Sequence, residues 1–250
     1  MKARYSIVLT AVAVALLALG VPGYASKMDS RIESSAKNSY LFTTYLRADD
    51  IKIRSTDGAV TLTGTVSEES HKAMAQETVA GLPGVKSVDN RLEVKDAPIS
   101  DSDAWLRDKV KVTLLFHRSV SVDTTEVDVK YGVVTLRGDA TSQAQKDLTT
   151  EYAKDVEGVK DVINEMAVSK PSKKTRTAGE KIDDASITAQ VKVTLLYHRS
   201  TSAINTKVDT KRGVVTLYGK ASNAAELNLA TKLANDVKGV KSVNNRMTIE

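Results

Sequence analysis

The stretch Gly132-Val-Val-Thr-Leu-Arg-Gly138 decides the fold, because the chain contains it three times. Gly213-Val-Val-Thr-Leu-Tyr-Gly219 is almost the same sequence, and Gly58-Ala-Val-Thr-Leu-Thr-Gly64 is a more divergent copy. Each copy is a β-rich run between two glycines, which is typical of a strand that leaves a tight turn. Offsets of 74 and 81 residues align the copies without a gap from the first helix to the last strand, which predicts three repeated modules.

Each repeat predicts the element order α-β-β-α-β. In the second repeat we expect helices at 103–117 and 143–156, a hairpin of strands 127–130 and 133–136, and a closing strand at 162–168. In the first repeat we expect helices at 31–46 and 68–82, the latter opening after Ser67 as N-cap. This order predicts an α+β fold in which each module has a three-stranded mixed sheet covered by two helices on one face.

The predicted organisation separates a leader from the modules. Lys2 and Arg4, the short apolar run 7–19 and Gly23-Tyr24-Ala25 are typical of a signal peptide cleaved after Ala25, although an uncleaved amino-terminal anchor is the alternative. We therefore expect a periplasmic protein. The predicted segments are a signal peptide at 1–25, module 1 at 28–95, module 2 at 101–169, a basic flexible linker at 170–181, and module 3 at 182–250.

The composition excludes some classes of site and indicates an anionic partner. The 250 residues contain no cysteine, so disulfides and thiolate metal sites are impossible. The net charge of +5 is uneven: residues 101–169 have 9 basic against 13 acidic side chains, whereas residues 182–250 have 10 against 6. Outside the cytoplasm such a cationic end is expected to meet lipid head groups or acidic polymers, and not nucleic acid.

Three further motifs carry a resemblance to a known family. A helix ends in Val-Lys-Val-Thr-Leu-Leu at 110–115 and 191–196, the repeated glycine-bounded strand follows it, and Gly-Val-Lys-x-Val begins the closing strand at 84–88, 158–162 and 239–243. Each module resembles a BON domain, and the resemblance covers nearly everything after the leader. It implies an envelope protein, linked to osmotic stress and envelope integrity, that has no enzymatic active site.

The resemblance also implies two kinds of partner. BON domains have been proposed to bind phospholipid, and a two-module outer-membrane lipoprotein of this family binds anionic phospholipid through the first helix of its second module. The helix from Ser102 to Leu115 is similar to that helix, so Trp105 and Leu115 are the positions that would carry its lipid contact over. The alternative function that the family implies is a periplasmic chaperone (holdase) or scaffold for unfolded envelope proteins.

The first helix of module 2 has more apolar surface than its own core needs. Leu106, Val110 and Leu114 form one stripe, whereas Trp105, Val112 and Phe116 lie about 130° around the helix. Either this second stripe packs against a neighbouring module or it faces the boundary between acyl chains and head groups, where tryptophan is favourable. The predicted lipid-binding residues are Trp105, Lys109, Lys111, Val112, Leu115, Phe116, Arg118, Lys192, Val193, Leu196, Tyr197 and Arg199.

Other candidate sites are weaker. His117 and His198 recur at one repeat position, which we interpret as a solvated helix end because no metal-ligand spacing accompanies them. No nucleophile with a base is evident, so the sequence predicts no catalytic residues, no cofactor and no metal. The leading prediction is a periplasmic stress protein whose partner is an anionic phospholipid membrane surface.

Overall fold

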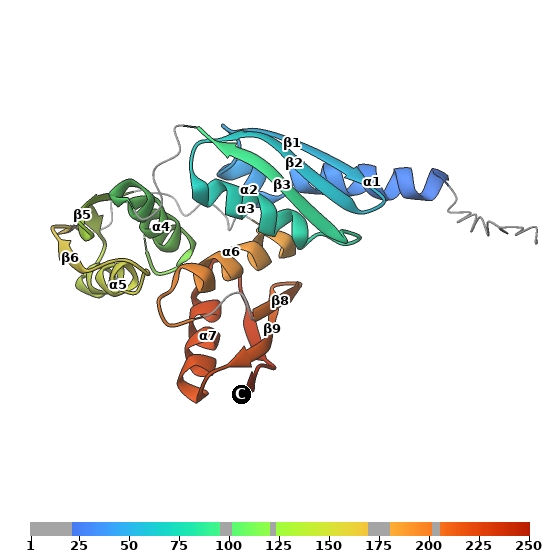
Figure 1. The fold of residues 1–250 in the computed structure, drawn as a ribbon. Helices are drawn as coiled ribbons and strands as arrows, with labels where there is room; N and C mark the ends of the chain where they lie inside the picture. The colour runs from blue at the N-terminus through green and yellow to red at the C-terminus, as the bar shows by residue number, and fades with distance from the viewer. Residues whose placement is uncertain (1–21, 96–101, 121–123, 170–180, 202–205) are drawn as a thin grey trace, which may run out of the picture.

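In the computed structural model the chain forms three α+β units, as predicted (Figure 1). The structure describes residues 22–95, 102–120, 124–169, 181–201 and 206–250. Residues 1–21 of the predicted leader and all of the predicted linker except Lys181 lie outside the described residues, whereas residues 22–25 of that leader form the start of the first helix. Module 1 consists of α1 (Pro22–Lys37), α2 (Tyr40–Thr44), β1 (Asp50–Thr56), β2 (Ala59–Val66), α3 (Glu69–Ala80) and β3 (Ser87–Val94). Module 2 consists of α4 (Asp103–Phe116), β4 (Thr125–Lys130), β5 (Val133–Ala140), α5 (Gln143–Lys154), β6 (Asp161–Asn164) and β7 (Ala167–Val168). Module 3 consists of α6 (Asp184–Tyr197), β8 (Thr206–Lys211), β9 (Val214–Ala221), α7 (Ala224–Asp236), β10 (Ser242–Asn245) and β11 (Thr248–Ile249).

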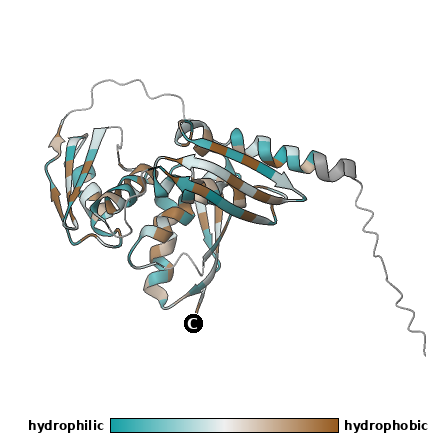
Figure 2. Cartoon of the chain, turned by 45° about the horizontal axis from the view of Figure 1, so that its top comes forward, coloured by the Kyte–Doolittle hydropathy of each residue, from teal (hydrophilic) through white to brown (hydrophobic). Residues whose placement is uncertain are grey.

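The sheet topology is the predicted hairpin with a parallel third strand. In module 2, β4 runs antiparallel to β5, with Val129 opposite Val134, and β6 and β7 run parallel to β5. Alternate residues of β4 and β5 are buried, and Figure 2 shows the corresponding alternation of hydropathy along the strands. The helices of each module therefore cover one face of its sheet, and the other face remains outward.

The hairpin turns explain the first glycine of each repeated stretch. Tyr131 has a φ of 54° and Gly132 a φ of 80°, and two positive φ values at the centre of a two-residue turn define type I′. Asp103, in the first turn of α4, accepts hydrogen bonds from the backbone N–H of Tyr131 at 2.6 Å and of Gly132 at 2.8 Å. Asp29 and Asp184 bind the other two turns in the same way, so each first helix is fixed to its hairpin.

Module 1 departs from the prediction at its first helix. The helix expected at 31–46 is broken between α1 and α2, and module 3 supplies partners for the exposed backbone. The N–H of Tyr40 donates to Asp183 at 2.7 Å, and the N–H of Leu41 donates to Ser186 Oγ at 3.2 Å. The break was not predictable from module 1 alone, because residues 143 and 145 positions along the chain stabilise it.

Two smaller predictions were also wrong. The closing strand expected at 162–168 is interrupted at Glu165 and Met166, because the Asn164 side chain turns to α5 and accepts a hydrogen bond from the Met166 N–H at 3.0 Å. The N-cap of α3 is Glu68, whose side chain makes no capping hydrogen bond, and not Ser67. Ser67 instead contacts His71 and Asp49.

Three hydrophobic clusters form the interior. Two of them are the cores of modules 2 and 3, and the third joins module 1 to residues of both other modules. Among the described residues no helix has the length and apolar character needed to cross a bilayer.

The second glycine of the repeated stretch has no room for a side chain. Gly138 has a φ of 109°, and a Cβ there would lie 1.8 Å from the carbonyl oxygen of Thr124. We expect Gly138→Ala to lower the free energy of unfolding by at least about 2 kcal/mol, from the left-handed conformation and the displaced strand together. Chemical denaturation measures this loss. The exposed neighbouring substitution Asp139→Ala is the control and should change stability by less than about 0.5 kcal/mol. An unchanged stability of Gly138→Ala would contradict the assigned geometry.

Candidate functional site

The first helices of modules 2 and 3 each use two faces. Leu106, Val110 and Leu114 of α4 pack into the core of module 2, which confirms the predicted core stripe. Ile187, Val191 and Leu195 of α6 occupy the same positions in the core of module 3. These two helices therefore anchor their own modules with one stripe and leave a second stripe for another contact.

The second stripe of each helix is covered by module 1. Val112 and Phe116 of α4 are 3% and 1% exposed, and Val193 and Tyr197 of α6 are 0% and 7% exposed. All four belong to the hydrophobic cluster of module 1, and Leu115 is partly buried against it. The structure therefore shows the packing alternative for these residues, because a membrane cannot reach them in this arrangement.

Trp105 and Lys109 belong to the same buried region. The Lys109 ammonium lies 4.2 Å from the centroid of the Trp105 ring and 5.4 Å from that of Tyr197. Lys109 is only 5% exposed, and its Nζ lies 3.4 Å from the backbone carbonyl of Glu157 and 3.7 Å from its carboxylate. Trp105 itself is half-buried, so its ring serves first as a cation–π partner inside the protein.

The remaining predicted lipid-binding residues differ in their environment. Lys192 forms an ion pair of 2.7 Å with Glu77 of α3, which fixes module 3 to module 1. Lys111 is half-buried, and Leu196 is 41% exposed. Arg118 and Arg199 lie just beyond the ends of α4 and α6, where they join modules 2 and 3.

The joint between modules 2 and 3 consists of two equivalent halves. In one half, the N–H of Arg118 donates to the carbonyl of Asp236 at 3.0 Å, and the N–H of Lys238 donates to the carbonyl of Phe116 at 2.9 Å. The other half has the N–H of Arg199 on Asp155 and the N–H of Glu157 on Tyr197, both at 2.9 Å. Every member of one half is 81 residues from its counterpart in the other, so the two modules contact each other with approximate twofold symmetry.

Each arginine of this joint caps a helix of the opposite module. The Arg118 guanidinium donates to the carbonyls of Asn235, Val237 and Val240 at the end of α7. The Arg199 guanidinium donates to Lys154, Val156 and Val159 at the end of α5. A cation is favourable at the carboxyl end of a helix, where carbonyl groups lack partners within the helix.

The interpretation of His117 and His198 as solvated helix ends was wrong. His117 is 1% and His198 7% exposed, because both lie inside the joint. His117 Nδ1 lies 3.1 Å from Asp236, and its ring stacks on Tyr152 with centroids 3.7 Å apart. His198 Nε2 lies 3.6 Å from Asp155, which is too long for a hydrogen bond.

Burial controls the protonation of the joint. Removal from water lowers the pKa of His198 below its ordinary value, although the nearby Asp155 carboxylate opposes this effect. Burial alone would raise the pKa of Asp236, but hydrogen bonds from His117 and Tyr152 outweigh it and hold that pKa below its ordinary value. Burial, with the hydrogen bond to Asp236, raises the pKa of Tyr152, so this tyrosine stays neutral.

Module 1 lacks the residues that make this joint. Thr43 and Thr44 occupy the repeat positions of the histidine and arginine, and Gly81 occupies the position of the aspartate. Module 1 therefore cannot pair as modules 2 and 3 do, and it packs on the sides of α4 and α6 instead. The absence of a His-Arg pair after its first helix was the signal in the sequence that could have revealed this difference.

Two kinds of side-chain cluster in the described residues bear on catalysis. They contain no group of three or more histidine, cysteine, aspartate or glutamate side chains placed to hold a metal. Ser67, His71 and Asp49 are close together, but the serine hydroxyl at 3.1 Å and the carboxylate at 2.6 Å both contact Nδ1 of His71. A catalytic triad needs the nucleophile and the carboxylate on different ring nitrogens, so this cluster is not one.

The chain belongs to the BON domain family, whose model matches residues 28–96, 102–170 and 183–250. It is similar to Osmotically-inducible protein Y of Escherichia coli K12, with 33% identity over 195 residues that cover 78% of this chain and 95% of that protein. It is also similar to the outer membrane lipoprotein DolP of Haemophilus influenzae, with 28% identity over 160 residues that cover 64% of this chain and 74% of that protein. A match to CdsD, a structural protein of the type III secretion system of Chlamydia trachomatis, has 16% identity, covers 88% of this chain and 90% of that one, and has a TM-score of 0.25, too low to support an inference.

The lowered pKa of His198 makes the stability of the joint depend on pH. The unfolded histidine binds its proton near pH 6.5, whereas the folded one binds it only at lower pH, so stability is lost as the pH falls below about 6.5. Chemical denaturation at about pH 7 and about pH 5.5 should therefore give a smaller free energy of unfolding at the lower pH. In His198→Gln this difference should shrink. An identical pH dependence in wild type and His198→Gln would contradict the assignment.

Proposed function

We propose that this protein is a periplasmic envelope-stress protein that binds anionic phospholipid at a membrane surface without catalysing a reaction. The observation that carries the proposal is the charge separation along the chain, with an excess of four basic residues in 182–250 and of four acidic residues in 101–169. Osmotically-inducible protein Y and an outer membrane lipoprotein are similar proteins, which supports a role in the envelope. The predicted leader agrees with a periplasmic location.

Binding through the first helices requires module 1 to separate. Val112, Phe116, Val193 and Tyr197 are buried in the cluster of module 1, and exposing such an apolar side chain costs about 1.5–3 kcal/mol. A basic residue near an anionic surface contributes only ~1 kcal/mol. If the protein binds through these helices, inserting the same side chains into the bilayer has to offset the free-energy cost of separating module 1. Binding through cations that are already exposed needs no such rearrangement.

The chaperone alternative depends on the same opening. The apolar stripes that would hold an unfolded client are covered by module 1, so a holdase would need the modules to separate before it binds. This alternative stays a prediction. It is distinguished from phospholipid binding by suppression of client aggregation in the absence of lipid.

A disulfide that locks module 1 to module 3 tests the route of binding. A Cβ on Gly81 would lie 3.5 Å from the Ala185 Cα, so cysteines at both positions are within disulfide range, and the chain has no native cysteine to interfere. We expect the oxidised Gly81→Cys/Ala185→Cys variant to float with anionic vesicles as well as its reduced form, because binding by exposed cations does not need opening. Vesicle flotation measures the bound fraction.

Each other outcome has a distinct meaning. Binding by the reduced form only would assign the contact to the first helix of module 3, one of the two helices that the sequence predicted. Equal recovery of the wild-type protein with anionic and zwitterionic vesicles would contradict phospholipid recognition itself. A second pair, His117→Cys/Val237→Cys, lies across the antiparallel bridge of the joint and extends the same test to modules 2 and 3.

A further inference from the structure

The sheets of the three modules each have one face that no helix of the same module covers. In module 3, α6 and α7 lie against one face of the sheet, and the opposite face is turned outward (Figure 1). Lys207 and Lys211 of β8, Tyr218 and Lys220 of β9, and Arg246 between β10 and β11 lie on this face, which we call the outward face of module 3.

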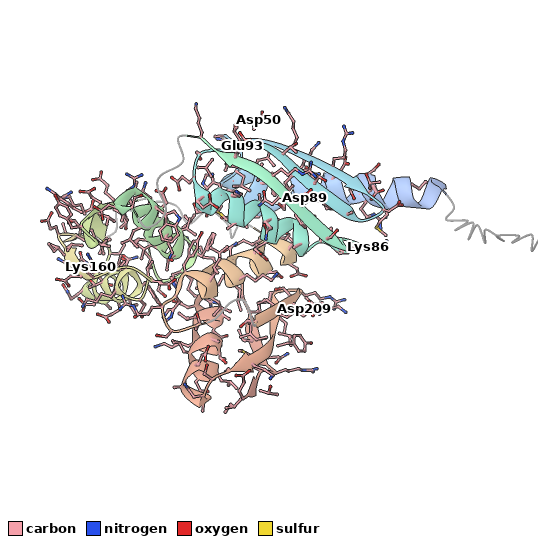
Figure 3. The ribbon with its side chains drawn as sticks, viewed as in Figure 1. Asp50, Lys86, Asp89, Glu93, Lys160 and Asp209 are labelled. Carbon is pink, nitrogen blue, oxygen red and sulfur yellow. The ribbon has the colours of Figure 1, made fainter. Side chains whose placement is uncertain are left out.

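The cations of this face are accessible. The side chains of Lys207 and Lys220 are 73% and 65% exposed. Asp209, the acidic strand residue among them, is 61% exposed, and Figure 3 labels it. Lys207 lies 3.9 Å from Asp209, and Lys220 lies 3.3 Å from Glu250 beyond the end of β11. Ion pairs this exposed hold their partners weakly, so both lysines remain available to another anion.

A comparison of the modules shows that this charge is not a property of the fold. The outward positions of the module 2 sheet carry two basic and five acidic residues, a net charge of −3. Those of module 3, with Glu250 counted because it pairs with Lys220, carry four basic and two acidic residues, a net charge of +2. The sign reverses at three equivalent positions: Glu126 and Lys207, Asp139 and Lys220, and Glu165 and Arg246.

Module 1 differs from both. Its outward positions carry three basic and three acidic residues, so the face is neutral overall. Arg91 lies 2.6 Å from Asp89, and Lys52 lies 3.7 Å from Asp50. Only the outward face of module 3 thus combines a positive charge with weakly held cations among the sheets that the structure describes.

A flat cationic face fits an anionic bilayer surface. Strand residues that alternate on one face are about 7 Å apart, which is within the screening length of about 8 Å at physiological ionic strength. Tyr218 lies in the middle, with its ring 5.9 Å from Lys207 Nζ, and an aromatic ring with a polar tip suits the head-group region. Each cation held near such a surface strengthens binding roughly fivefold.

We propose that the outward face of module 3, and not the second stripe of α4 and α6, binds the anionic phospholipid surface. The inference rests on the proposed function and adds to it the surface that makes the contact. In this orientation α6 and α7 lie behind the sheet, and module 1 can stay packed on α6 while the protein is bound.

Charge reversal on this face tests the proposal. We expect Lys207→Glu/Lys220→Glu/Arg246→Glu to reduce the affinity for vesicles that contain phosphatidylglycerol by about 100-fold, since three cations are lost. The matched control Lys130→Glu/Lys154→Glu/Lys160→Glu makes the same change of net charge in module 2 and should reduce affinity by less than about tenfold. Thermal melts followed by circular dichroism verify that both variants are folded.

A variant that is expected to gain vesicle affinity complements the variants that are expected to lose it. Glu126→Lys/Asp139→Lys/Glu165→Arg copies the cations of module 3 onto module 2, and we expect it to bind the same vesicles at least tenfold more tightly than the wild type. The assigned surface is wrong if this variant binds the vesicles no more tightly than the wild type and the two charge-reversal variants lose affinity equally.

The outcomes separate this inference from the function on which it rests. If the wild type does not distinguish anionic from zwitterionic vesicles, the proposed function fails. If the wild type binds anionic vesicles and the module 3 variant binds them equally well, the function stands and the surface is wrong. The outward face of module 3 could instead bind the acidic outward face of module 2 in a second copy of the protein. In that case the average mass measured by sedimentation at low salt rises with protein concentration, and the module 3 variant abolishes this rise. That result also overturns the inference.

Discussion

The burial of the second stripes of α4 and α6 by module 1 is the interaction on which the arrangement of the protein depends. A module of about 68 residues has little interior of its own, and domains of this size are only modestly stable. Val112, Phe116, Val193 and Tyr197 join the cluster that Ile32, Leu41 and Met74 form in module 1, so the three modules share apolar surface. The broken first helix of module 1 follows from this contact, since Asp183 and Ser186 replace its missing helical partners.

Much of this fold follows from periodicity in the sequence. The repeat spacing gave the three modules, and Leu106, Val110 and Leu114 gave the inner face of α4, because a helix with a single-sheet core needs one stripe. The second stripe was recognisable as surplus, but its partner was not. A membrane and another module offer the same apolar surface to a helix, and only tertiary structure shows which one is present.

The candidate site shows where sequence reasoning fails for a different reason. His117 and His198 follow the ends of helices, where histidine is usually solvated, and nothing local indicates that the symmetric joint buries them. The charge of the outward sheet faces was visible only as a regional excess. It becomes a surface property once strand register places Lys207, Lys220 and Arg246 on one side of the sheet. Thus one fold presents three different exteriors: neutral, acidic and basic.

Many of the hydrogen bonds in the joint between modules 2 and 3 involve main-chain atoms. Arg118 and Arg199 donate to carbonyl groups at the ends of α7 and α5, and such carbonyls exist whatever side chains the residues carry. The arginine contacts therefore do not depend on the side chains at the helix ends, whereas the contacts of His117 and Tyr152 require the Asp236 carboxylate. A copied module that keeps this arginine thus carries half of the arginine contacts with it, because their acceptors belong to the backbone of the helix that it meets.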